Sequence, residues 1–178
     1  AVKSILPPHA ELAVDANCKF GRDEALAYAR MLAPFRLRWF EEPCDPLDFA
    51  LLAEIAGGYD GPLSTGENLF STADVENLVR FGGLEPSRRD VIQVDPPQAY
   101  GIVQYVRTLA MLKDGGWPRS ALFPHGGNQM SLAITAGKAG LVMDPQGQKI
   151  YFTWDEASDR GGTYANFVQM EGLGFPVW

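Results

Sequence analysis

The sequence has few cysteines and no concentration of basic charge. Cys18 and Cys44 are its only cysteines and do not form a CxxC pair, so nothing supports a disulfide framework and we expect two reduced thiols. The formal net charge is -7, and no cluster of lysine and arginine interrupts the acidic balance. This charge repels phosphate backbones and anionic lipid, so we expect neither nucleic acid nor a membrane surface as a partner.

Long apolar runs are also missing. No run approaches the roughly 20 residues that cross a bilayer, and the start, Ala1 to Ser4, lacks the apolar segment of a signal peptide. We therefore expect a cytoplasmic protein. With 178 residues, 46% of them hydrophobic, the chain can bury one sizeable core but is too short for two ordinary domains. The expectation is a single domain over residues 1–178.

Short strand-like runs alternate with amphipathic helical patterns along residues 1–144, which indicates an α/β fold of βα units around a parallel sheet. Residues 145–178 are expected to hold a last strand, at 149–154, and a C-terminal tail. Ser71 before an acidic first turn, Gly82 and Gly83 after a helix, and Pro46 in a first turn mark helix boundaries. The predicted strands are 11–15, 37–41, 62–67, 90–95 and 120–125, and the predicted helices are 23–33, 46–57, 71–81, 98–113 and 129–141.

Each predicted strand of residues 1–144 ends in a titratable side chain. These residues are Asp15, Glu41, Glu67, Asp95 and His125, at intervals of 26, 26, 28 and 30 residues. The intervals are close to the about 31 residues per βα unit of an eight-unit barrel. Because the carboxyl ends of parallel strands lie at one edge, we expect the five side chains to converge there.

Three carboxylates on neighbouring strands, Asp15, Glu41 and Glu67, cannot all stay ionised close together without a counter-charge. A hard divalent cation with oxygen ligands supplies that charge, and Mg²⁺ fits best. Glu42 follows Glu41 directly, and period-2 alternation sends only one of the two inward. The alternation alone does not say which. A lone acid at a strand end is more often a helix cap or a solvated group, so the prediction depends on the recurrence.

Three of these strand ends resemble the ligand motifs of the mandelate racemase branch of the enolase superfamily. The motifs are Val14-Asp15-Ala16-Asn17, Trp39-Phe40-Glu41-Glu42-Pro43 and Thr65-Gly66-Glu67-Asn68. The resemblance runs from about residue 11 to 137 and is strongest to acid-sugar dehydratases of the D-tartrate dehydratase type. It implies a TIM-type (β/α) barrel, with the first Glu of EEP as a ligand beside Asp15 and Glu67.

The same resemblance implies a chemistry. Mg²⁺ would stabilise the enediolate of a small hydroxy-carboxylate, tartrate-like or a sugar acid, during dehydration. Asp95 would orient His125, which would transfer a proton. Asn17 and Asn68 would contact the substrate, although as Asx residues they could equally satisfy turn backbone. Racemisation or epimerisation of a 2-hydroxy acid is the alternative outcome.

The resemblance is incomplete at the amino-terminal side. The catalytic Lys-x-Lys of this branch, its first barrel strands and its capping domain have no counterpart before Asp15, and Lys3 is too close to supply that base. We therefore expect the chain to be a partial barrel from a longer, homo-oligomeric Mg-dependent hydro-lyase, and to be inactive alone. The remaining alternative is a non-catalytic metal-binding barrel fragment.

Overall fold

The computed structural model describes residues 2–7, 10–126, 130–131, 134, 141–143 and 149–151. The α-helices are α1 (Val2–Ile5), α2 (Arg22–Leu32), α3 (Phe49–Gly58), α4 (Thr72–Phe81) and α5 (Ile102–Asp114). Short 3-10 helices are η1 (Ala33–Phe35), η2 (Pro86–Arg88) and η3 (Arg119–Ala121). The strands are β1 (Val14–Asp15), β2 (Phe40–Glu41), β3 (Leu63–Thr65), β4 (Val91–Ile92), β5 (Leu141–Met143) and β6 (Lys149–Tyr151).

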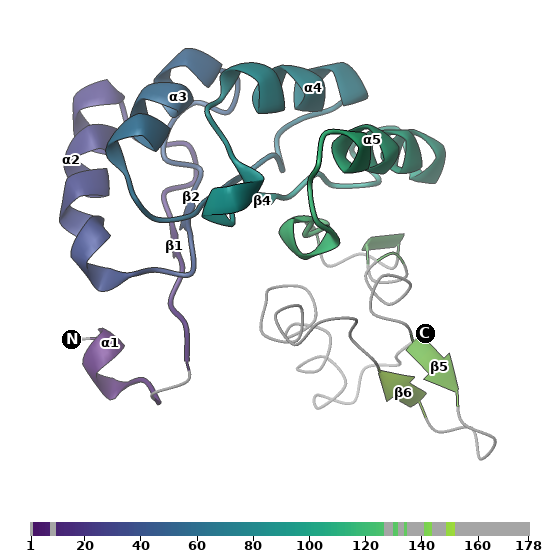
Figure 1. The fold of residues 1–178 in the computed structure, drawn as a ribbon, viewed down its shortest axis with the longest axis horizontal. Helices are drawn as coiled ribbons and strands as arrows, with labels where there is room; N and C mark the ends of the chain where they lie inside the picture. The colour runs from purple at the N-terminus through teal and green to yellow at the C-terminus, as the bar shows by residue number, and fades with distance from the viewer. Residues whose placement is uncertain are drawn as a thin grey trace.

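The first four strands form one parallel sheet in the order β1-β2-β3-β4, so each strand pairs with the next one along the chain. The chain continues this order at Leu122, which forms a parallel bridge to Ile92 of β4. Helices α2 to α5 lie in sequence along one side of the strands, each packed on the next (Figure 1). A sheet wound in one direction with helices on one face is part of a TIM-type barrel, since a doubly wound sheet reverses its strand order. The predicted fold class is confirmed.

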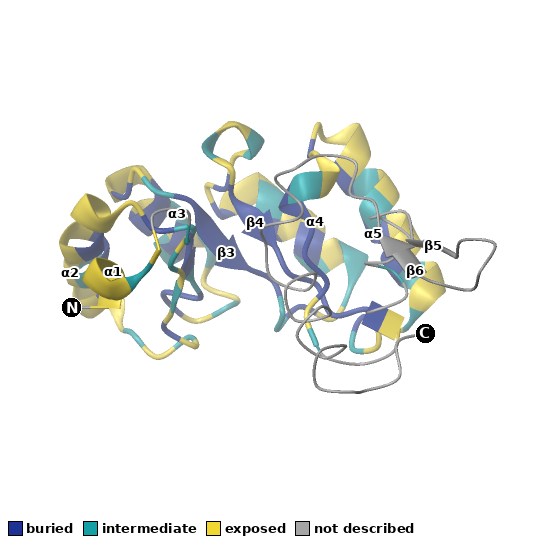
Figure 2. Ribbon diagram, turned by 90° about the horizontal axis from the view of Figure 1, so that it is seen from below, coloured by how far each residue is buried: buried dark blue, intermediate teal, exposed yellow. Residues whose placement is uncertain are grey.

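Alternating side chains give the sheet two different faces. Phe40, Leu63 and Ile92 belong to the large core beneath the helices. Their neighbours Trp39 and Val91 pack with Phe123 in a separate cluster. Successive residues of a strand point to opposite faces, so this second cluster lies on the face away from the helix layer. Figure 2 shows β3 and β4 buried along their length, as expected for strands covered on both sides.

Most predicted elements are present, and two helices begin later than expected. The helix predicted from residue 46 begins at Phe49, because Asp48 caps it and accepts a hydrogen bond from the Leu51 backbone N–H. The helix predicted from residue 98 begins at Ile102, because Tyr100 and Gly101 have positive φ and interrupt helical geometry. The cap at Ser71 is as expected, with a reciprocal contact to Asp74.

The carboxyl-terminal predictions are met only in part. The first two residues of the predicted strand 120–125 belong to the 3-10 helix η3, which spans Arg119–Ala121, and the pairing found is the bridge at Leu122. The predicted helix 129–141 lies mostly outside the described residues, and its last residue, Leu141, belongs to strand β5. The predicted last strand is present as β6, which pairs antiparallel with β5, while residues 152–178 lie outside the described part.

Asp90 holds the amino-terminal ends of β3 and β4 together, and its replacement is expected to destabilise the fold. Its fully buried carboxylate accepts from the backbone N–H groups of Leu63, at 2.8 Å, and Glu85, at 2.7 Å, and pairs with Arg88 at 2.6 Å. Asp90→Ala leaves these donors unpaired and should lower the free energy of unfolding by about 3–5 kcal/mol in urea titrations. The exposed Asp60→Ala should change it by less than about 0.5 kcal/mol. Equal effects of the two changes would contradict this role.

Candidate active site

The five predicted side chains all lie at or just beyond the carboxyl ends of successive strands. Asp15 ends β1 and Glu41 ends β2, and the two residues pair directly in the ladder. Glu67 follows β3, Asp95 follows β4, and His125 follows the segment that bridges to β4. Because the strands are parallel, these positions share one edge of the sheet, the edge at which barrel enzymes carry their active sites.

The structure distinguishes Glu41 from its neighbour Glu42. Trp39 and Glu41 lie on the same face, and the Trp39 Nε1–H donates to Glu41 Oε2 at 2.6 Å. Gln93 Nε2 donates to Glu41 Oε1 at 3.0 Å. Glu42 has a φ of 41°, which breaks the extended strand geometry immediately after Glu41. Glu41 is therefore the residue that faces away from the helices.

Glu42 is buried instead, with 1% of its surface exposed. Its Oε1 accepts from Asn68 Nδ2 at 2.7 Å, while Oε2 has no hydrogen-bond partner in the described part of the chain. The backbone N–H of Cys18 donates to the Glu42 carbonyl at 2.9 Å. Glu42 thus joins the segments that follow β1, β2 and β3. The Asn68 amide group, predicted to contact substrate, has one of its two N–H donors engaged here.

His125 lies between two carboxylates. Its Nδ1 is 3.3 Å from Asp95 Oδ2, and its Nε2 is 3.3 Å from Glu67 Oε2. The Asp95 side chain is 12% exposed and the His125 side chain 42% exposed. Asp95 is therefore largely buried, while the His125 ring is accessible to solvent. The backbone carbonyl of His125 accepts from Ser131 Oγ at 2.8 Å. The structure thus brings the predicted acid–imidazole pair together and adds Glu67 to it.

Asn17 lies in a tight turn immediately after β1. It is exposed, has a φ of 47°, and its backbone N–H donates to Asp15 Oδ1 at 2.7 Å. Asparagine tolerates this left-handed conformation better than most residues. The side chain that accepts from this turn backbone is that of Asp15, so both roles predicted for the Asn17 side chain stay predictions.

The carboxylates of the site interact electrostatically. Burial raises the pKa of Glu41, reinforced by the charges of Asp15 and Glu42 and opposed by the hydrogen bonds from Trp39 and Gln93. Burial also raises the pKa of Glu67; the charges of Glu42, Glu41 and Asp15 add to this shift, and His125 opposes it. Each raised pKa means that the ionised form is disfavoured by its surroundings. The edge is therefore a concentration of negative charge suited to a cation.

The two thiols next to this edge are poor candidates for metal ligands. Burial, together with the neighbouring Glu42, raises the pKa of Cys18 well above its ordinary range. Burial raises the pKa of Cys44 to about 12, with the charges of Asp45 and Asp48 contributing. Both shifts favour the protonated thiol, whereas the thiolate is the form that binds metal. The two cysteines are free thiols, as predicted.

The donor set fits Mg²⁺ by its chemistry, since Asp15, Glu41 and Glu67 offer only carboxylate oxygens. Within the described ranges, no three His, Cys, Asp or Glu side chains are placed closely enough to hold a metal ion as they stand. Glu41 is hydrogen-bonded to Trp39 and Gln93, and Glu67 contacts His125.

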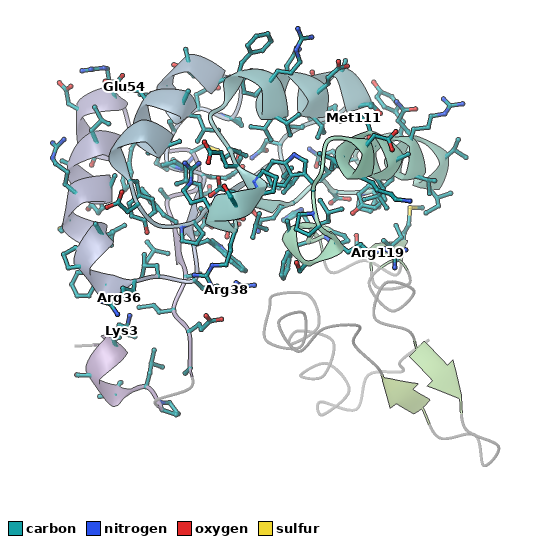
Figure 3. All side chains as sticks on the ribbon, in the orientation of Figure 1. Lys3, Arg36, Arg38, Glu54, Met111 and Arg119 are labelled. Carbon is teal, nitrogen blue, oxygen red and sulfur yellow. The ribbon has the colours of Figure 1, made fainter. Side chains whose placement is uncertain are left out.

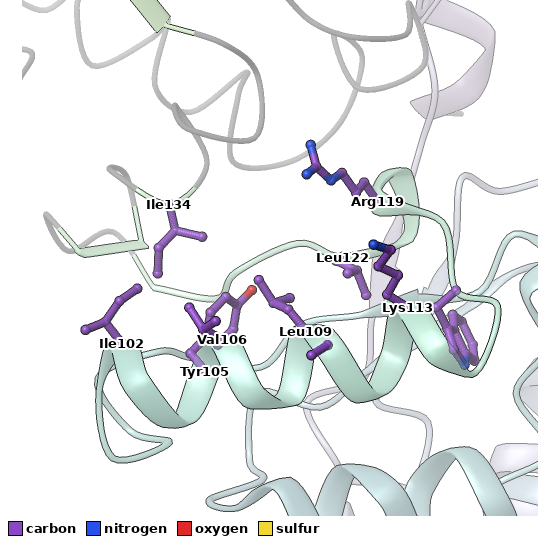
Figure 4. Close-up of a pocket in the computed structure, with 10 residues that line it drawn as sticks. Ile102, Tyr105, Val106, Leu109, Lys113, Arg119, Leu122 and Ile134 are labelled. Carbon is purple, nitrogen blue, oxygen red and sulfur yellow. The ribbon is translucent and has the colours of Figure 1, made fainter.

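Two other features lie away from this edge. Lys3 donates to the Arg36 carbonyl at 3.3 Å, before β2 begins, and therefore lies at the opposite end of the strands (Figure 3). A cavity of about 510 Å³ runs along α5, lined by apolar residues such as Val106, Leu109 and Leu122, with Lys113 and Arg119 as its charged members (Figure 4). Among the described residues, its lining includes no carboxylate or imidazole and none of the five candidate site residues.

Sequence reasoning missed Gln93 and the contact between Glu42 and Asn68. Gln93 lies two residues before Asp95 in the run Asp90-Val91-Ile92-Gln93-Val94-Asp95. Period-2 alternation could have placed Gln93 on the same face as Asp95. No local pattern could have shown that it reaches Glu41, which is 52 residues away and on another strand.

A singly wound parallel sheet with carboxylates and a carboxylate–imidazole pair at its carboxyl edge defines an enolase-type (β/α)-barrel domain. The chain belongs to the enolase C-terminal domain-like family, whose profile matches residues 1–165. None of the described helices is long and apolar enough to cross a membrane.

The relatives include acid-sugar dehydratases and racemases. The chain is 32% identical to L-talarate/galactarate dehydratase of Salmonella typhimurium over 136 residues, which are 76% of this chain and 32% of that enzyme. The solved structure of that dehydratase matches with a TM-score of 0.66 at 30% identity, covering 76% of this chain and 32% of the other. The chain thus spans about a third of the length of this relative.

Two further solved structures contain magnesium. L-Talarate dehydratase from Polaromonas sp. JS666, complexed with Mg and L-glucarate, has a TM-score of 0.64 at 31% identity over 74% of this chain and 34% of its own. A racemase from Streptomyces coelicolor A3(2) with bound magnesium has a TM-score of 0.62 at 32% identity over 70% of this chain and 33% of its own. Enolase-superfamily relatives therefore carry out both dehydration and racemisation.

Proposed function

We propose that the full-length protein containing this chain is a Mg²⁺-dependent dehydratase of a hydroxy-carboxylate, either a sugar acid or a tartrate-like acid. The observation that carries the proposal is the arrangement at the carboxyl edge. Asp15 and Glu41 are neighbours in the ladder between β1 and β2, and the His125 side chain lies between the carboxylates of Glu67 and Asp95. The dehydratase relatives support this substrate class, since their names specify aldarates.

Asp15, Glu41 and Glu67 would hold Mg²⁺. When bound, the ion would supply positive charge to the substrate carboxylate and to the negative charge that develops as the α-proton leaves. Two hydrogen bonds, from Trp39 and Gln93, would keep Glu41 in place for this role.

His125 would move the proton. Asp95 accepts at Nδ1, so Nε2 is the nitrogen that can exchange a proton with substrate. Because Nε2 lies 3.3 Å from Glu67 Oε2, it would be close to a substrate whose carboxylate binds a metal ion on Glu67. In dehydration a base contributed by the rest of the full-length protein would accept the α-proton, and the C–OH bond on the neighbouring carbon would break. Protonated His125 would deliver the proton with which the hydroxyl leaves as water, and the resulting enol becomes a 2-keto-3-deoxy acid.

Racemisation or epimerisation is the second candidate, favoured by the racemase among the relatives. In that reaction His125 would return a proton to the α-carbon, and no C–O bond would break. The same residues would serve both reactions, so the outcome depends on whether a leaving hydroxyl is placed near Nε2.

The test is turnover of a panel of hydroxy acids, including galactarate, galactonate and tartrate, in Mg²⁺ and in EDTA. Proton NMR in D₂O separates the reactions, since dehydration yields a 2-keto-3-deoxy acid and racemisation gives α-deuteration without loss of water. Mg²⁺-dependent formation of a keto acid is the expected result. α-Deuteration alone would replace dehydration with racemisation. Absence of both for every acid would overturn the catalytic proposal in favour of a metal-binding barrel domain.

The proposal extends to assembly and location. We expect the full-length protein to be a cytoplasmic homo-oligomer, with free thiols and the acidic net charge of -7 in accord with that location. Light scattering on the purified full-length protein measures the assembly.

A further inference from the structure

The Glu41 carboxylate is held from both sides by uncharged donors. The indole N–H of Trp39 donates to Oε2 at 2.6 Å, and the amide of Gln93 donates to Oε1 at 3.0 Å. Both donor residues are only 8% exposed. The carboxylate therefore has one hydrogen bond to each oxygen and retains a lone pair on each for another partner.

Gln93 reaches Glu41 across the intervening strand β3. In the ladder, Ser64 pairs with Glu41 on one side and with Val91 on the other. The residue two positions further on is Gly66, which has no side chain and a φ of 119°. A Cβ there would lie 3.3 Å from the Gln93 backbone nitrogen, which is a tight contact. Glycine at this position thus allows the chain just after β3 to lie close to the backbone of Gln93.

The packing beneath fixes the two donors. Trp39 packs with Val91 and Phe123 in the cluster on this face of the sheet, with the Trp39 and Phe123 rings edge to face at 5.6 Å. Val91 lies two residues before Gln93 and on the same face. The side chain of Trp39 and the strand that carries Gln93 are therefore held by buried packing.

The amide orientation of Gln93 has an energetic cost. A carboxylate only accepts, so Nε2 must point to Glu41, and the opposite atom, Gln93 Oε1, is buried without a hydrogen-bond partner in the described part of the chain. A buried unpaired acceptor lowers stability. The hydrogen bond from Gln93 to Glu41 is thus present although the Gln93 Oε1 atom is left without a partner. Such a cost to stability is typical of side chains that have a role in a functional site.

We propose that Gln93 is a positioning residue that orients Glu41 as a metal ligand. The inference rests on the proposed Mg²⁺ site and deepens it. An uncharged amide is suited to this task, because it fixes one lone pair of the carboxylate without the positive charge with which lysine or arginine would compete against the metal. The hydrogen bond from Trp39 fixes the other oxygen in the same way.

Gln93→Met in the full-length protein tests the inference, since it keeps much of the side-chain volume and removes the amide. Titration calorimetry with MgCl₂ should show an affinity about 10- to 100-fold weaker than wild type. The melting temperature in EDTA should change little, because the loss of the hydrogen bond to Glu41 is offset by the removal of the unpaired Oε1. A merely structural Gln93 would give the opposite pattern, with a lower melting temperature in EDTA and unchanged Mg²⁺ affinity.

Gln104→Met is the matched control. Gln104 Nε2 donates to Thr72 Oγ1 at 2.8 Å between the first turns of α5 and α4, and this contact involves none of the proposed metal ligands. This variant should keep wild-type Mg²⁺ affinity. If wild type binds Mg²⁺ and Gln93→Met binds it with the same affinity, the positioning role alone is overturned. Absence of Mg²⁺ binding by wild type would overturn the proposed metal centre and the positioning role together.

Discussion

His125→Asn is expected to reduce turnover by about 10²- to 10⁴-fold, the usual contribution of a positioned proton-transfer group. Asparagine can still hydrogen-bond to Asp95, but it cannot gain and lose a proton near neutral pH. The loss should fall on kcat more than on KM, because His125 acts in the step that moves a proton. Steady-state kinetics on the acid identified from the panel measures both parameters.

The variant should keep its metal site. His125 Nε2 contacts Glu67 Oε2 at 3.3 Å, so removing the imidazole frees that carboxylate oxygen, and Mg²⁺ affinity should be retained or increased. Calorimetric titration with MgCl₂ provides this control. Wild-type turnover in His125→Asn would remove the imidazole from the mechanism, and loss of Mg²⁺ binding would show that its role is in the metal site.

Glu67→Gln is expected to abolish stabilisation by Mg²⁺ and, with it, turnover. A ligand that binds only the folded state stabilises it by RT ln(1 + [L]/Kd), which is about 2.7 kcal/mol at a concentration 100 times Kd. The amide of the variant replaces a charged oxygen ligand with a neutral one that also carries N–H donors. Thermal unfolding in EDTA and in increasing MgCl₂ measures the difference between the two proteins.

Glu54→Gln is the control for the loss of one negative charge. Glu54 pairs with Arg22 on the helix layer, and its side chain is partly exposed. This variant should keep the full Mg²⁺-dependent shift. Identical shifts in wild type and Glu67→Gln would contradict a metal site that includes Glu67.

Periodicity predicted the elements whose burial follows from local pattern. The amphipathic stretch 71–81 is helix α4, and its cap at Ser71 could be inferred because the capping contact lies within four residues. The helix starts near 46 and 98 were wrong, since they depend on the Asp48 cap and on positive φ at Tyr100 and Gly101. Strand 120–125 was overestimated, because a strand needs a partner and only Leu122 is paired.

The sequence by itself determined the order of βα units and the recurrence of Asp15, Glu41, Glu67, Asp95 and His125 at strand ends. Both depend on spacing along the chain, which local hydrophobicity encodes. Resemblance supplied the Asp95–His125 pair, and the structure brings its two side chains to 3.3 Å.

Only the tertiary structure decided which neighbours these side chains have. It turned Glu41 toward Trp39 and buried Glu42 against Asn68, although the two glutamates are adjacent and chemically the same. It also brought Gln93 to Glu41 across 52 residues. The physical reason is that the packing of whole βα units sets the register of the strands and the distances between side chains on different strands. Contacts between strands therefore depend on the assembled sheet and not on any single segment.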